Sequence, residues 1–145
     1  MGKEKIMKII AQDNNTLLIR FDKDEDVIER LIQFAKKENL PGATFTIIGA
    51  AKKVTLSYYN LSQKQYEDHS YEEDMEITTV SGNISWMEDD VIIHAHGTFS
   101  NQKLEVIGGH LKSLIISATG EVVLQKIATT LTREFDEETG LNLLR

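Results

Sequence analysis

The stretch Val91-Ile92-Ile93-His94-Ala95-His96-Gly97-Thr98-Phe99 decides the fold class of this chain. It is rich in the β-branched and aromatic residues that favour strands. Side chains alternate between the two faces of a strand, so the apolar residues at positions 91, 93, 95 and 99 are expected to face a core. His94 and His96 then project together from the opposite face.

Further strand-like segments lie on both sides of this stretch. They are residues 16–21, 43–50, 54–59, 77–86, 104–107, 114–118 and 121–124. A clear helical period occurs at residues 27, 28, 31, 32 and 35, which are apolar at the spacing of one helix face, and Asn39 and Pro41 follow as stop signals. The sequence therefore predicts an α+β fold, a mostly antiparallel sheet of about seven or eight strands with one long early helix packed on it.

Glycines and charged residues set the expected turns and loops. Gly108-Gly109 is expected to break the strand at residues 104–107, and Thr119-Gly120 to separate two more. Six acidic residues between Glu67 and Glu76, with no Lys or Arg among them, predict a long polar loop. The polar tail ends in three leucines that are candidates for packing or for sealing an interface. No linker is visible, so residues 1–145 are expected to form one domain with its core at about 6–135.

Composition limits the classes of function. The chain has 145 residues, 16 basic against 23 acidic, a formal net charge of −7 and no cysteine. Disulfide and thiolate chemistry are excluded, and a cytoplasmic location is expected. No apolar run approaches the roughly 20 residues of a membrane helix, and the charged first residues lead into no signal-peptide core. The net charge opposes direct DNA binding, whose affinity comes mostly from Lys and Arg placed against phosphates.

Three of the four histidines indicate a metal site. His94 and His96 share a strand face, and His110 follows Gly108-Gly109, where glycine permits a close backbone approach that brings His110 beside the pair. Three imidazoles suit zinc or a similar divalent ion with a fourth position open, and Glu105 is a candidate fourth ligand or a partner of one of the ligands. The alternative is that the histidines only satisfy neighbouring polar groups.

Other chemical motifs are absent from the sequence. There is no Gly-x-Ser-x-Gly elbow, no phosphate-binding Gly-x-x-x-x-Gly-Lys loop and no Gly-x-Gly-x-x-Gly, so no organic cofactor is indicated. The fourth histidine, His69, lies in the acidic stretch and is expected to be solvated.

The same residues carry a family resemblance. The segments Gly49-Ala50, Val80-Ser81-Gly82-Asn83-Ile84-Ser85, His94-Ala95-His96 and Gly108-Gly109-His110-Leu111 come in the order seen in the plant-and-prokaryote conserved (PPC) domain, and Glu121-Val122-Val123-Leu124 follows. Over about residues 6–135 the chain resembles the prokaryotic members, which stand alone without AT-hooks. The resemblance implies a homotrimer, a histidine cluster near the subunit interface that matches His94, His96 and His110, and structural roles for Gly82, Gly108 and Gly109.

The resemblance also bears on partners. Plant members of the family follow AT-hooks in nuclear DNA-binding proteins, and prokaryotic members carry a DNA-binding label. This chain has no Arg-Gly-Arg-Pro hook to enter a minor groove. Where plant members have a Gly-Arg-Phe-Glu-Ile-Leu element for partner contacts, it reads Glu73-Asp74-Met75-Glu76-Ile77-Thr78. The plant partner contact is therefore not carried over.

Three functions are consistent with these observations. The first is a trimeric, transcription-associated DNA-binding module that acts with protein partners and not at a membrane. The second is a metal site of the zinc type, for a small ligand or for a hydrolytic reaction, built on the three histidines. The third is a purely structural oligomerisation module. Enzymatic activity is not the leading expectation.

Overall fold

The structure, a computed structural model, describes residues 7–145; residues 1–6, which the sequence includes in the domain, lie outside the described residues. Its elements are β1 (Lys8–Gln12), β2 (Thr16–Asp22), α1 (Val27–Lys37), β3 (Gly42–Asn60), β4 (Gln65–Tyr71), β5 (Met75–Met87), β6 (Asp90–Ser100), β7 (Val106–Ile127), β8 (Arg133–Asp136) and β9 (Leu141–Leu144).

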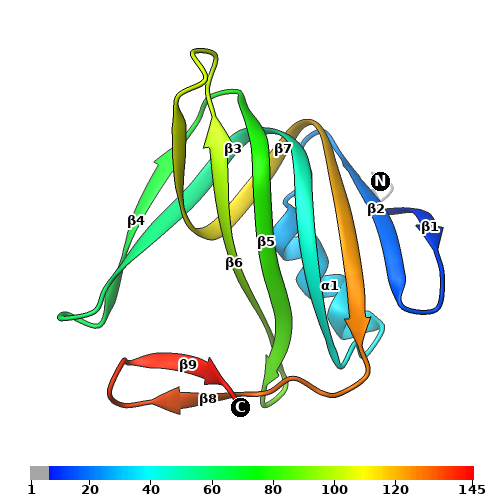
Figure 1. Ribbon diagram of the computed structural model, residues 1–145, viewed down its shortest axis with the longest axis vertical. Helices are drawn as coiled ribbons and strands as arrows, with labels where there is room; N and C mark the ends of the chain where they lie inside the picture. Colours follow the sequence, from blue (N-terminus) through cyan, green and yellow to red (C-terminus); the bar gives the residue numbers. More distant parts are fainter. Residues whose placement is uncertain (1–6) are drawn as a thin grey trace, which may run out of the picture.

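Seven strands form the main sheet, in the order β1-β2-β7-β6-β5-β3-β4, and β7 also pairs with β3. These strands pair antiparallel throughout. β8 and β9 form a separate two-stranded sheet at the foot of the view in Figure 1. The predicted α+β class and the mostly antiparallel sheet are confirmed.

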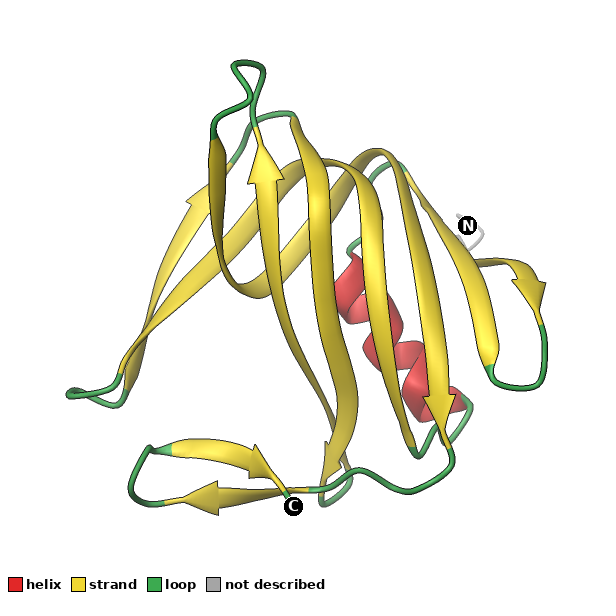
Figure 2. Cartoon of the chain, in the orientation of Figure 1, coloured by secondary structure: helices red, strands yellow, loops and turns green. Residues whose placement is uncertain are grey.

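The helix packs against one face of the sheet, as Figure 2 shows. Asp26 caps its first turn, because the Asp26 carboxylate accepts hydrogen bonds from two main-chain amides of that turn. The buried side of α1 consists of Val27, Leu31 and Ala35, at the spacing that the sequence predicts. After the helix, Asn39 adopts φ 46°, a left-handed conformation that ends helices.

β3 and β7 are longer than the sequence predicts. Each continues through its expected breaks, so the prediction that Gly108-Gly109 and Thr119-Gly120 end strands is wrong. Residues 42–49 of β3 pair with residues 120–127 of β7, and residues 51–57 with residues 110–116. Gly49 is the last residue of the first ladder, at φ 146°, and an added Cβ there would meet the carbonyl oxygen of Thr119 at 2.1 Å. Glycine here allows a bend and a register shift inside a continuous strand.

The acidic stretch is also different from the prediction. Residues 65–71 form the edge strand β4, not a loop, and pair with the second half of β3. β4 shows no hydrophobic alternation, because nearly all of its side chains are exposed on both faces. In addition to its ladder with β3, side-chain contacts stabilise β4. Ser57 donates to the Asp68 carboxylate at 2.6 Å, and Lys112 forms an ion pair with the same carboxylate.

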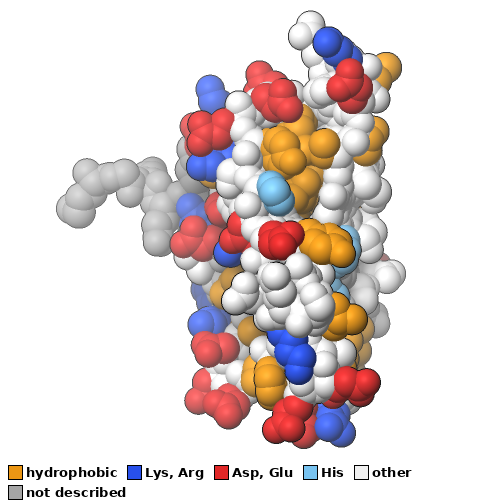
Figure 3. Space-filling view, turned by 90° about the vertical axis from the view of Figure 1, so that its left-hand side faces the viewer, with side chains coloured by type: hydrophobic (Ala, Val, Ile, Leu, Met, Phe, Trp, Pro, Cys, Tyr) orange, Lys and Arg blue, Asp and Glu red, His pale blue; other side chains and the backbone are white. Residues whose placement is uncertain are grey.

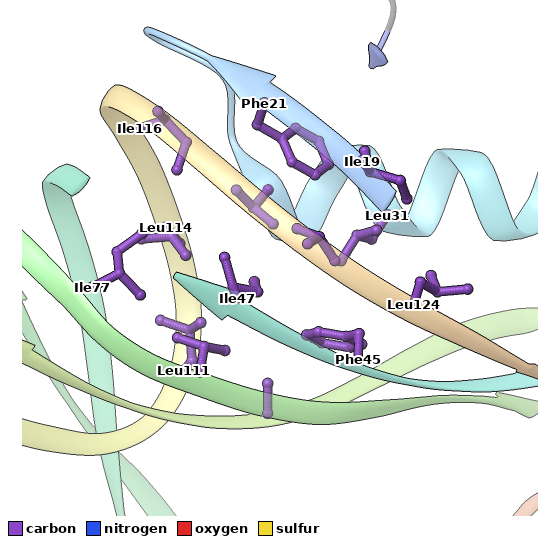
Figure 4. Close-up of a cluster of buried hydrophobic side chains, with 14 of the residues drawn as sticks. Ile19, Phe21, Leu31, Phe45, Ile47, Ile77, Leu111, Leu114, Ile116 and Leu124 are labelled. Carbon is purple, nitrogen blue, oxygen red and sulfur yellow. The ribbon is translucent and has the colours of Figure 1, made fainter. Parts of the chain in front are cut away.

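The core lies between the sheet and α1. Its largest fully buried side chains include Phe21, Phe99 and Leu114, and Figure 4 shows how side chains from β2, β3, β5, β7 and α1 meet. The alternation of β3, β5, β6 and β7 leaves their other face outside this core. Among residues 7–145 there is no helix with both the length and the apolar character needed to span a membrane.

Candidate metal centre

The strand β6 places two histidines outside the core, as the sequence predicts. Val91, Ala95 and Phe99 are 6%, 1% and 0% exposed and face inward. His94 and His96 alternate with them and are exposed on the outer face. Across β5, the neighbours of these histidines on the same face are Asn83 and Ser81.

His110 reaches the pair through the strand register. β6 and β7 form a hairpin in which His96 lies directly opposite His110. The preceding glycines lie inside β7, where a Cβ at Gly108 would come within 2.9 Å of the Gly97 carbonyl oxygen and one at Gly109 within 3.1 Å of the Ser57 carbonyl oxygen. The expected proximity of the three histidines is confirmed, but glycine serves close strand packing and not a turn.

Gly82 has a similar role on β5. A Cβ at this position would lie 2.6 Å from the carbonyl oxygen of His94 and 2.7 Å from the ring of Phe45. Glycine therefore lets β5 pack tightly against the strand that carries the two exposed histidines.

The three imidazoles converge on one point. Their ring centroids are 5.1 Å apart for His94 and His96, and 5.5 Å apart for His110 with each of the other two. The Nε2 atoms of His94 and His96 are 3.2 Å apart, and one ring nitrogen from each residue lies within 4.8 Å of the others. Three nitrogens at about 2.0–2.1 Å from one tetrahedral ion would be about 3.3 Å apart. One pair already meets this spacing, and the ligand nitrogen of His110, within 4.8 Å of the others, would have to move closer to bind the same ion.

The protonation state of the cluster suits a metal. Burial, together with the charges of His94 and His96, lowers the pKa of His110 from 6.5 to about 4. Burial, and then the charges of His96 and Arg133, also lower the pKa of His94. Neutral imidazole is the form that binds metal ions, so at neutral pH these two residues need lose no proton to become ligands.

An aromatic pair flanks the cluster. Tyr66 packs on His110 with ring centroids 4.8 Å apart, and Tyr59 packs on Tyr66 at the same separation. The hydroxyl of Tyr59 donates to the carbonyl oxygen of Thr139, in the turn between β8 and β9. Sequence reasoning missed this wall, because Tyr66 belongs to the edge strand that was expected to be a loop.

A shallow pocket of about 490 Å³ opens on the other side of the histidines. His94 and His96 line it together with polar residues of β3, β5 and β7, which are Thr44, Thr46, Ser81, Asn83 and Gln125. Its size is that of a site for a small molecule. Figure 3, which faces the β4 edge of the sheet, shows histidine side chains at the surface among hydrophobic and acidic neighbours.

The two remaining candidates lie elsewhere. Glu105 is in the turn between β6 and β7, where its amide donates to the Asn101 side chain at 3.1 Å, and its carboxylate is not in the group of converging ligand atoms. His69 is exposed on β4. Arg133, from the β8 strand, was not a candidate in the sequence, yet it donates to Asn83 beside the histidines at 2.8 Å.

Comparisons with known proteins agree with this architecture. The model of the Plants and Prokaryotes Conserved (PCC) domain matches residues 9–128. A candidate DNA-binding protein of Bacteroides thetaiotaomicron is 27% identical, with a TM-score of 0.92 over 97% of this chain and 98% of its own. A candidate DNA-binding protein of Ralstonia eutropha is also 27% identical, with a TM-score of 0.86 over 98% and 96%. A metal-containing protein of Archaeoglobus fulgidus is 29% identical, with a TM-score of 0.83 over 97% and 99%. No curated protein matches the chain.

Proposed function

Because the chain belongs to the Plants and Prokaryotes Conserved domain family, whose members share this fold, we propose that it is a metal-binding module whose ligands are His94, His96 and His110. The observation that carries the proposal is the convergence of three ring nitrogens within 4.8 Å of one another. The similar Archaeoglobus protein, which contains a metal, supports it. An all-imidazole set favours zinc or a similar divalent ion, with one position left for another ligand.

The chemistry of such a site follows from its surroundings. When bound, the ion would supply Lewis acidity to a small ligand or to a hydrolytic reaction. The chain itself contributes the pocket beside the histidines, whose hydroxyl and amide side chains can orient a polar ligand. On the other side of the cluster, the ring of Tyr66 packs against the His110 imidazole.

The proposal is tested by the metal content of the tag-free protein, measured by elemental mass spectrometry after incubation with zinc and gel filtration. We expect about one ion per chain. The double variant His94→Ala/His96→Ala should lose it, because a single imidazole remains. His69→Ala, a change of the exposed histidine on β4, is the matched control and should keep it. A double variant that retains the metal would refute this ligand set. If neither the wild type nor the double variant binds metal, and the double variant is less stable, the structural role is favoured.

A second proposal concerns assembly and nucleic acid. We propose a trimeric, transcription-associated module, as the relatives named candidate DNA-binding proteins suggest. Leu18 and Val123 are 38% and 42% exposed and lie opposite each other in the β2–β7 ladder, and Ile48 is 56% exposed nearby on β3. An apolar surface of this kind favours burial against another chain.

Two measurements test this second proposal. Light scattering should give three times the 16.4 kDa chain mass, and the monomer mass would contradict a trimer. In an electrophoretic shift assay at moderate salt, a chain of net charge −7 should bind duplex DNA weakly or not at all by itself. Tight direct binding would show that a local basic surface outweighs the net charge, and its absence would direct the search to protein partners.

A further inference from the structure

Arg133 is held against the outer face of β5 by neutral groups alone. Its Nε donates to Ser85 Oγ at 2.7 Å, its Nη2 to Asn83 Oδ1 at 2.8 Å and its Nη1 to the carbonyl oxygen of Asn142 at 2.8 Å. The side chain is half-buried. Within residues 7–145, no carboxylate lies within ion-pair distance of its guanidinium.

This arrangement sets Arg133 apart from the other arginines of the chain. Arg20, Arg30 and Arg145 each lie within ion-pair distance of a carboxylate. A cation removed from water without an anionic partner is costly, and burial lowers the pKa of Arg133 accordingly. The half-buried guanidinium is therefore a place where an anion would be stabilised.

Arg133 is also close to the histidine cluster. Its partner Asn83 lies directly across the β5–β6 ladder from His94, and both residues line the 490 Å³ pocket. The hydrogen bonds to protein use three of the five N–H groups of the guanidinium, and one N–H on each terminal nitrogen is left. Arg133 thus reaches the pocket wall through Asn83, and a metal ion on the histidines would add a second positive charge beside the same pocket.

We propose that this pocket binds a small carboxylate anion between the metal ion and Arg133. The inference rests on the metal site proposed above and names the class of ligand that would occupy its open position. A carboxylate has two oxygens, so it can bind an ion with one and accept a hydrogen bond from the guanidinium with the other. One arginine matches its single charge, whereas a phosphate usually collects more cationic donors. Thr44, Thr46 and Ser81 supply hydroxyls for the rest of the ligand.

The experiment uses the full chain loaded with Co²⁺, whose visible spectrum reports the ligands around the ion. Sodium acetate is the probe, titrated at constant ionic strength against sodium chloride. We expect a saturable change of the cobalt spectrum in the wild type. Arg133→Gln should weaken acetate binding by about tenfold or more, since one charge-assisted contact is lost, and should leave cobalt binding intact.

The matched control is Arg145→Gln. Arg145 is an exposed arginine that directly follows β9 in the β8–β9 hairpin and forms an ion pair with Glu134. This variant should bind acetate as the wild type does. If Arg133→Gln does not fold, Arg133→Lys decides: it keeps the charge without the planar fork, and acetate binding about threefold weaker or more supports the proposal, whereas unchanged binding overturns it.

The outcomes separate the two proposals. A wild-type chain that binds no cobalt would overturn the metal site and this inference together. Tight cobalt binding without an acetate response, or with a response that ignores Arg133, would overturn the carboxylate site alone. Inorganic phosphate is titrated in parallel; if it binds tighter than acetate with the same dependence on Arg133, the site belongs to phosphate and the carboxylate assignment is wrong.

Discussion

The pH dependence of metal affinity follows from the state of His110. An imidazole with a pKa of 6.5 must lose its proton before it binds a metal, so acid weakens a histidine site. In this chain the pKa of His110 is lowered to about 4, chiefly by burial and then by His94 and His96. Between pH 5 and pH 6, His110 is therefore already neutral and contributes no proton to the competition.

The magnitude can be worked out for that interval. Three independent imidazoles of pKa 6.5 would lower the apparent metal affinity about 500-fold from pH 6 to pH 5, and two would lower it about 60-fold. Because His110 is neutral here, the fall should be about eightfold smaller than the three-imidazole reference, and the lowered pKa of His94 reduces it further. The direction is fixed: affinity falls with acid, but less steeply than for three ordinary histidines.

The assay is zinc competition against a chelator of known pH dependence, at pH 5.0, 5.5 and 6.0, on the metal-free chain. Far-UV circular dichroism at each pH shows that the chain is folded. A fall close to 500-fold would show that all three ligands carry protons in this range and would refute the argument from burial.

The lowered pKa of His110 also affects the stability of the metal-free protein. Below pH 6.5 the unfolded chain binds more protons at His110 than the folded chain does, so the free energy of unfolding should decline as the pH falls toward 4.

Three further substitutions test the packing of β5, β6 and the core. Gly82→Ala should cost about 1–3 kcal/mol in urea denaturation and weaken zinc binding, because the new Cβ would meet the His94 carbonyl oxygen at 2.6 Å; full stability would contradict the close approach. Trp86→Phe removes the indole donor to the Leu40 carbonyl oxygen, 2.7 Å away, and should cost about 1 kcal/mol by the same measurement. Phe99→Ala, at a fully buried position, should cost about 3–5 kcal/mol, and a loss below 1 kcal/mol would place Phe99 outside the core.

The sequence predicts those strands that have one buried face. The alternation of β6 and the helical period of α1 are visible because the core selects every second residue of a strand and one side of a helix. β4 has no such selection, since both of its faces are exposed, and a run of acids there is indistinguishable from a loop. The breaks expected in β3 and β7 fail for another reason: a glycine that allows a bulge looks in sequence like a glycine that ends a strand.

Some residues of the candidate site are likewise predictable from the sequence, and others are not. His94 and His96 follow from strand periodicity, and their proximity to His110 follows from short-range spacing in one hairpin. Arg133 carries no local signal, because it comes from a hairpin that the main sheet does not include and reaches β5 across 48 residues of sequence. Tyr66 was not predicted as part of the site, because β4 was expected to be a loop. Residues that complete a site from distant segments are set by tertiary packing, which periodicity does not report.

The pairing register of β6, which buries Val91, Ala95 and Phe99, also places His94 and His96 on the outer face of the sheet. A strand shifted by one residue would exchange its faces, which would bury His94 and His96 and expose Ala95. Gly82 and Ala95 lie opposite each other in the β5–β6 ladder, and an added Cβ at Gly82 would lie 2.8 Å from that of Ala95. The missing side chain of Gly82 and the small one of Ala95 allow this close pairing, in which His94 and His96 face outward. We infer that substitutions in the core beneath β6 would alter metal affinity without contact with the ion, because they act on the register that aims its ligands.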